Sequence, residues 1–343
     1  MAQAAKHYSG SSESLESIQE MVARVRLLHV PPAPVSCVPT FDLPANALAF
    51  AKILTNTHTL TTPTLDPLGL SLSPLSARLN HSCTPNAYIV FSGPALHIRS
   101  LLPIPANAEL TISYIDSTLP RALRVAELST RYFFACHCPL CIAEDAQSAP
   151  MVTEVSKAKK ANALLSRAKS EVDPHRALDL LQQARNLLRP EPLHIYPCPA
   201  ILHQQLLSAL SLQDWILALK NALSTYFAID PLLFPQTHHP VRVVHHWVLL
   251  RLLVQVAEVV SSSQAGARTE GLREVRWEVV IYGLWKELKE TVEQSHGKGS
   301  AFKREVMAFG EQLAEGGRVM EGEGRLEGFV KEELDRLRRW AGV

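Results

Sequence analysis

A tight cluster of cysteines is the feature that most constrains this chain. The segment CHCPLC places Cys136, Cys138 and Cys141 within six residues, with a proline between the last two. This spacing is typical of thiolates that surround one zinc ion, whereas three ordinary buried thiols would rarely lie so close together. Disulfides are a poor alternative, because an intracellular chain of 343 residues keeps its thiols reduced. We therefore expect a zinc site here.

The expected zinc site needs a fourth ligand, because structural zinc is almost always four-coordinate. From spacing alone the candidates are Cys83, Cys37, Cys198, His137 or another nearby histidine. Four thiolates would leave no position for water, so the metal would organise the fold and would not catalyse a reaction. Cys37 and Cys198 lie in proline-rich surroundings, and we interpret them as ordinary core or surface thiols.

The charge and hydropathy of the chain restrict its partners. A net charge of +1 provides no overall field that would attract nucleic acid or an anionic membrane. Residues 1–20 are polar and lack the apolar core of a secretory signal, so we interpret them as a flexible lead-in. The apolar run 247–260 is shorter than the ~20 residues of a spanning helix and reads as a buried helix. We expect an intracellular monomer in the nucleus, the cytoplasm or both, with no membrane or nucleic-acid contact.

The sequence changes character near residue 150. Before it, short apolar runs at 87–91, 96–98 and 110–114 predict strands, and one helix, at 45–54, interrupts this β-rich half. After it, apolar residues recur at helical spacing, with small alanines where paired helices approach closely. The fold class is α+β, with an all-α, helical-hairpin (TPR-like) domain at 150–343. We expect its helices at 152–169, 175–188, 199–210, 213–228, 241–259, 271–293, 301–313 and 326–340.

Three motifs in the first half occur in a recognisable order. They are LNHSCTPNAYIVF (79–91), ELTISYID (109–116) and YFFACHCPLC (132–141), preceded by AFAKILTNTHTL and PLGLSLSP. Together they resemble the SET and MYND family of protein lysine methyltransferases, from about Ala45 to Cys141. The resemblance implies a partial SET domain with a pseudoknot at 21–130, a post-SET zinc module at 131–145, and the family's helical domain after it.

The resemblance assigns roles to particular residues. It places Cys83 on the zinc with Cys136, Cys138 and Cys141, so that it supplies the missing fourth ligand. It implies S-adenosylmethionine as cofactor, and the residues that match its binding positions are Asn56, Asn80, His81 and Phe134. Tyr114 and Tyr132 correspond to tyrosines that line the active site and the lysine channel, and Tyr114 is our first choice as the catalytic residue.

Two parts of the family pattern have no counterpart here. Residues 1–44 hold one glycine, Gly10, and one cysteine, Cys37, so neither the opening Gly-x-Gly strand nor the MYND finger can be placed. The segment PANAEL also lacks the family's usual glycine, although Asn107 can adopt the left-handed turn that glycine favours. A truncated sequence, a diverged enzyme and an inactive scaffold are the three explanations, and we favour truncation of an active enzyme.

The predicted function is therefore S-adenosylmethionine-dependent methylation of a lysine in a protein or peptide, histone or otherwise. The reaction needs a neutral amine aligned with the methyl carbon, and a narrow aromatic channel lowers the lysine pKa by removing water. The alternative is a catalytically inactive SET-like scaffold whose helical half binds a partner. The paired histidines at 238–239 and 245–246 have no recognised ligand spacing, and we do not expect a metal there.

Overall fold

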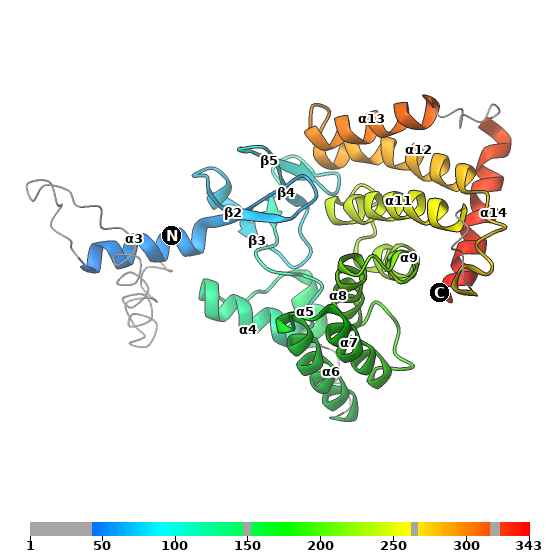
Figure 1. The fold of residues 1–343 in the computed structure, drawn as a ribbon. Helices are drawn as coiled ribbons and strands as arrows, with labels where there is room; N and C mark the ends of the chain where they lie inside the picture. The colour runs from blue at the N-terminus through cyan, green and yellow to red at the C-terminus, as the bar shows by residue number, and fades with distance from the viewer. Residues whose placement is uncertain (1–42, 147–151, 262–266, 316–322) are drawn as a thin grey trace, which may run out of the picture. The chain divides into compact units, whose positions relative to one another are not determined.

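The structure is a computed structural model that describes residues 43–146, 152–261, 267–315 and 323–343 (Figure 1). Within these ranges the chain forms two compact units. The first comprises residues 43–61, 67–86 and 104–146, and the second comprises residues 62–66, 87–103 and those from 152 onward. The lead-in expected at 1–20, and Cys37, lie outside the described residues. A region of short strand pairs and helices followed by a mostly helical region confirms the predicted α+β fold class.

The first unit combines short strand pairs with helices. Helix α3 (Leu43–Asn56) leads directly into β1 (Thr57–Thr61), which pairs antiparallel with β2 (Pro67–Leu72). Strand β3 (Asn80–His81) pairs in parallel with β6 (Thr111–Ile112). The predicted helix at 45–54 is confirmed as the central part of α3.

The expectation that a single helix interrupts the first half is wrong. Two more helices, α4 (Arg121–Tyr132) and α5 (Pro139–Asp145), follow the last strand of the unit. A proline stands immediately before α4 and at the first position of α5, where its missing N–H costs no hydrogen bond. Helix α4 is amphipathic, but it was missed because its inner face holds the charged Arg124 beside Leu128.

A β-hairpin belongs to the second unit. Strands β4 (Ala87–Ser92) and β5 (Ala95–Ser100) pair antiparallel and confirm the strands predicted at 87–91 and 96–98. Gly93 has a φ of 58° in the turn between them, a conformation that glycine adopts without strain. The Arg99 guanidinium donates hydrogen bonds to the carbonyl oxygens of Glu293 and Gln294, near the C-terminal end of α12 (Trp277–His296).

The remaining helices of the second unit agree with most predicted ranges. They are α6 (Val152–Ser170), α7 (Pro174–Leu187), α8 (Cys198–Ser211), α9 (Trp215–Ser224), α10 (Asp230–Leu233), α11 (Pro240–Ser261), α13 (Ala301–Glu315) and α14 (Glu323–Ala341). Consecutive helices from α6 to α9 pack on one another, as helical hairpins do.

Two predicted helix boundaries in this unit are wrong. In place of the single helix predicted at 213–228, the α-helix α9 ends at Ser224, and a π-helical turn, η3 (Thr225–Ile229), connects it to α10. The proline at the second position of α10 lacks the N–H that a continuous α-helix would use, which favours this change of winding. The helix predicted from 271 begins only at Trp277, because Gly271 has a φ of 82° in the preceding turn.

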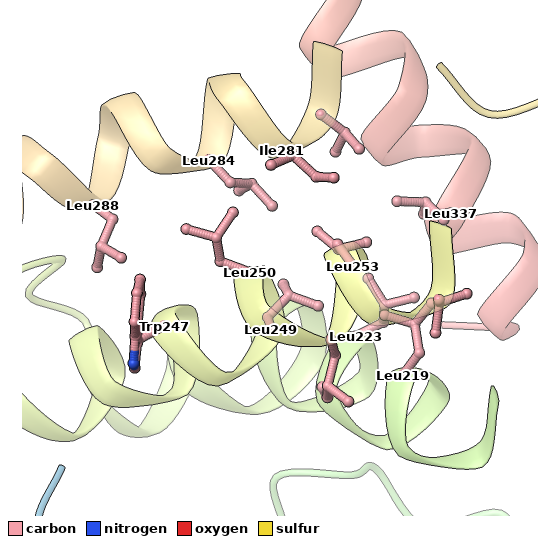
Figure 2. Packing of buried hydrophobic residues seen from close by; sticks show 14 of the residues in the cluster. Leu219, Leu223, Trp247, Leu249, Leu250, Leu253, Ile281, Leu284, Leu288 and Leu337 are labelled. Carbon is pink, nitrogen blue, oxygen red and sulfur yellow. The ribbon is translucent and has the colours of Figure 1, made fainter. Parts of the chain in front are cut away.

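The main core surrounds helix α11. Figure 2 shows Leu249, Leu250 and Leu253 of α11 between Leu219 of α9 and Ile281 of α12. By length and composition alone α11 could cross a membrane, and half of its most apolar window is buried inside the structure. The prediction of a buried helix here is confirmed by the side chains that enclose it. A smaller core joins α6, α7 and α8 through buried alanines and leucines.

Candidate metal and aromatic site

Four cysteines converge in the first unit. Cys83 follows β3, Cys136 and Cys138 precede α5, and Cys141 lies in the first turn of α5. Their sulfur atoms all lie within 4.8 Å of one another, and all four are free thiols. Tetrahedral zinc with Zn–S bonds of 2.3 Å requires sulfurs about 3.8 Å apart. The 3.6 Å between the sulfurs of Cys83 and Cys141 therefore fits one edge of such a tetrahedron.

The surroundings of the cluster shift the pKa values of its thiols. Burial opposes ionisation of Cys138, but the backbone N–H groups of Cys141 and Cys83 overcome it and lower the Cys138 pKa to about 6. In contrast, burial and the neighbouring Cys141 thiol raise the pKa of Cys83. Four such thiols with one divalent cation form a closed site, which suits a structural metal and leaves no position for water.

The other candidates for a fourth ligand lie elsewhere. Cys198 is buried in the small core of α6, α7 and α8, which is part of the second unit. His137 is exposed to solvent between two of the clustered cysteines. Cys37 lies outside the described residues. The group that the structure brings together is thus the one that the family resemblance implied, namely Cys83 with the three cysteines of CHCPLC.

His81 links the cysteine cluster to the aromatic residues. Its Nδ1 accepts a hydrogen bond of 3.0 Å from the Tyr114 backbone N–H, so its ring proton belongs on Nε2. Nε2 lies 3.3 Å from the Cys83 sulfur and can donate to it. Burial, aided by the positive charge of Arg124, lowers the pKa of His81 to about 4. The imidazole is therefore neutral at physiological pH and holds Cys83 and the backbone of Tyr114 together.

Three aromatic side chains gather beside His81. The rings of Tyr114 and Tyr132 are 5.0 Å apart, and the Phe134 ring lies 6.3 Å from Tyr114 and 5.9 Å from His81. The Tyr114 hydroxyl donates to the Leu79 carbonyl, and the Tyr132 hydroxyl donates to the Tyr114 carbonyl at 3.2 Å. Burial raises the pKa of both tyrosines, so both phenols remain protonated.

Asn80 lies at the start of β3, next to His81. Its side-chain amide donates to the Glu109 carboxylate. Asn86 fixes the approach to β6, because its Nδ2 donates to the Glu109 carbonyl and its Oδ1 accepts the Thr111 N–H. The intervening loop contains Asn107 with a φ of 65°, which confirms the predicted left-handed turn.

Asn56 occupies a different position from the other predicted cofactor residues. It is the last residue of α3, and its side-chain amide donates to the carbonyl of Lys52 at 2.7 Å and to Thr55 Oγ1 at 2.9 Å. These bonds are within its own helix. The structure thus brings together His81, Phe134 and the two tyrosines. The exposed side chain of Asn80 bonds to Glu109, and the contacts of Asn56 are local.

Sequence reasoning missed Arg124, the buried charged residue of this site. Only 2% of Arg124 is exposed, and its side chain extends from α4 to the sulfur of Cys141. Its spacing of four residues from the fully buried Leu128 places both on the inner face of α4. An arginine in phase with the apolar residues of a helix was the available signal. Glu109, which orients Asn80, had no comparable signal because it lies in an irregular segment.

A model of the SET domain family matches residues 12–115 of this chain. The chain is 41% identical over 92 residues to SET domain and MYND-type zinc finger protein 6 of Schizosaccharomyces pombe, which covers 27% of this chain and 19% of that protein. It is 40% identical over 115 residues to histone-lysine N-methyltransferase SMYD3 of Mus musculus, covering 34% and 26%.

A longer but more distant match extends to N-lysine methyltransferase SMYD2 of Homo sapiens, with 28% identity over 182 residues. It covers 48% of this chain and 42% of that protein. The resemblance to the SET and MYND family is confirmed by these matches. The matched part of the chain spans about a fifth to a quarter of the first two relatives.

Proposed function

We propose, on the premise that residues 12–115 carry a SET domain related to those of the SET and MYND family, that this chain is an S-adenosylmethionine-dependent protein lysine N-methyltransferase. The observation that carries the proposal is the grouping of Tyr114, Tyr132 and Phe134 around His81. An aromatic enclosure of this kind suits the long apolar stem and the positive head of a lysine side chain.

S-adenosylmethionine, when bound, supplies an electrophilic methyl group. Asn80, His81 and Phe134 would hold it, because Phe134 offers a partly exposed ring for a purine face. Asn80 adds an uncharged amide that can donate to and accept from a purine edge. Asn56 is proposed as a further contact, for which its hydrogen bonds to Lys52 and Thr55 would have to open.

The two tyrosines would prepare the lysine. Each phenol directs its proton at a backbone carbonyl, so the oxygen of each hydroxyl presents lone pairs to a substrate N–H group. Removing water from the channel would lower the pKa of the lysine and favour the neutral amine that attacks the methyl carbon. Tyr114, tied to Leu79 through its hydroxyl and to His81 through its N–H, is the better oriented of the two and is the proposed catalytic residue.

Zinc is the proposed metal of the cysteine cluster. Four sulfur ligands within 4.8 Å of one another select zinc over the hard cations, which prefer oxygen. The metal would join the segment after β3 to the start of α5, and through His81 it would steady the backbone of Tyr114. The substrate would be a lysine of a protein or peptide, histone or non-histone. The enzyme would act as a monomer in the nucleus or cytoplasm.

A non-catalytic interaction module is the second candidate, and one observation favours it. Leu70 and Leu72 alternate along β2, so they share one face of the β1–β2 pair, and Leu68 lies at the register shift before them; each of the three is more than half exposed. Exposed apolar faces of this kind commonly bind other proteins.

The test combines binding and turnover on the full, zinc-loaded chain. Calorimetry would measure S-adenosylmethionine binding, and transfer of a radiolabelled methyl group to core histones would measure activity. We expect micromolar binding, and we expect Tyr114→Phe to retain binding while losing about 100-fold or more of the transfer rate. A folded, zinc-containing chain that binds no cofactor would contradict the proposal and support the interaction module.

A further inference from the structure

Arg124 is a charged side chain enclosed among the groups of the metal site. It lies on the second turn of α4 with its guanidinium between that helix and α5. Only 2% of the residue is exposed. Arginine is seldom buried to this degree unless its charge is compensated nearby.

The guanidinium has three recorded acceptors. One terminal nitrogen donates to the Leu119 carbonyl at 2.6 Å. The other donates to the Glu144 carboxylate and lies 3.9 Å from the sulfur of Cys141. A guanidinium keeps its charge in proteins, so Arg124 is a buried cation.

Four thiolates carry more negative charge than one divalent metal neutralises. Four thiolates and one divalent metal sum to two negative charges, which is unfavourable away from water. His81 accepts at Nδ1 from the Tyr114 N–H, so it can offer Cys83 only a hydrogen bond from Nε2. Glu144, on α5, adds a further negative charge and is itself paired with Arg124. Arg124 cancels the charge of Glu144 in this sum, and its terminal nitrogen, 3.9 Å from the Cys141 sulfur, places a buried positive charge directly beside the thiolates.

We propose that Arg124 is a positioning residue of the metal site, whose guanidinium offsets the thiolate charge and orients Cys141, and that it thereby sets how firmly the metal is held. This inference rests on the proposed zinc site. Outer-shell partners of metal ligands commonly change metal affinity by about 10- to 100-fold when removed.

The experiment measures zinc transfer from the full chain to a chromogenic chelator, 4-(2-pyridylazo)resorcinol, after the zinc content of the wild type is established. We expect Arg124→Gln to release zinc about 10- to 100-fold faster. Arg124→Lys keeps the charge and should release zinc at an intermediate rate. Arg121→Gln is the matched control, because Arg121 also joins α4 to α5, through an exposed ion pair with Asp145, and lies outside the recorded contacts of the cysteines.

A second readout separates charge from simple bridging between helices. With Co²⁺ in place of zinc, Arg124→Gln should shift the sulfur-to-metal charge-transfer band, because Cys141 loses its donor. Glu144→Gln leaves Arg124 charged, so we expect it to hold zinc at least as firmly as the wild type. If Arg124 only tied α4 to α5 through Glu144, then Glu144→Gln would release zinc as fast as Arg124→Gln.

The outcomes distinguish this inference from the zinc assignment. A folded wild-type chain without zinc would remove the proposed metal itself. A zinc-containing wild type whose Arg124→Lys and Arg124→Gln variants release zinc at the wild-type rate would overturn the role of Arg124 alone. If Arg124→Gln does not fold, the comparison of Arg124→Lys with Glu144→Gln decides. Faster zinc release from Arg124→Lys, together with wild-type release from Glu144→Gln, supports the inference. Equally faster zinc release from both variants overturns it.

Discussion

Gly310→Ala should destabilise the helical unit, although alanine is the better helix former. Gly310 lies inside α13 and faces Trp285 of α12. A Cβ atom at Gly310 would meet the indole ring at 2.1 Å from Cζ2 and 2.2 Å from Cε2. The indole cannot simply turn away, because its Nε1 donates to the Val306 carbonyl at 2.8 Å.

The magnitude follows from two opposing effects. Carbon atoms pack at about 3.5 Å or more, so the new methyl would have to displace the ring or the helix by more than about 1 Å. Overpacking of this size costs about 3 kcal/mol, while replacing glycine by alanine in a helix interior contributes about 1 kcal/mol. The expected net loss is about 2 kcal/mol. For a unit of this size that corresponds to a decrease in melting temperature of about 4 to 8 °C.

Thermal unfolding followed by circular dichroism at 222 nm, at constant zinc, would measure the effect. The matched control is Gly328→Ala in α14, where a Cβ atom would meet nothing within 4 Å. It should stabilise the chain by about 1 kcal/mol, since only helix propensity changes. If Gly310→Ala melted at or above the wild-type temperature, the close packing of α12 on α13 derived from Trp285 would be refuted.

Two further predictions concern the metal and pH. Cys138→Ser should lower both the zinc content, measured by inductively coupled plasma mass spectrometry, and the melting temperature. The control Cys198→Ser, outside the cluster, should keep its zinc. Full zinc occupancy in Cys138→Ser would rule out Cys138 as a ligand. Burial, with the charges of His238 and His245, lowers the pKa of His239 to about 4, so the unfolded chain binds more protons than the folded chain between about pH 6.5 and 4. The contribution of neutral His239 to the free energy of unfolding is complete above about pH 6.5 and is lost as the pH falls, by about 2 kcal/mol at pH 5. Urea unfolding at pH 8 and pH 5 should show a smaller loss of stability in His239→Phe than in the wild type. An equal loss in both proteins would contradict this prediction.

The local features of this protein could be predicted from its sequence. Helical periodicity located most of the helices after residue 150, because their apolar faces repeat along a continuous segment. The turn at Asn107 followed from a residue that tolerates a positive φ. The predictions failed where neighbours outweighed local preference. Helix α4 hides a charged residue on its inner face, and the β1–β2 pair has a second strand that is mostly exposed.

The site divides in the same way. The spacing of CHCPLC indicated a metal because three of its ligands are local, and the family resemblance added Cys83, 58 residues before Cys141. The sequence did not determine that His81 joins Cys83 to Tyr114, that Asn56 bonds within α3, or that Arg124 lies against the thiols. Such contacts join segments far apart along the chain and depend on side-chain directions that only packing sets. Residue types and spacing thus determined which chemistry the chain can carry, and the tertiary structure decided which groups meet, because burial and hydrogen-bond geometry are properties of the folded chain.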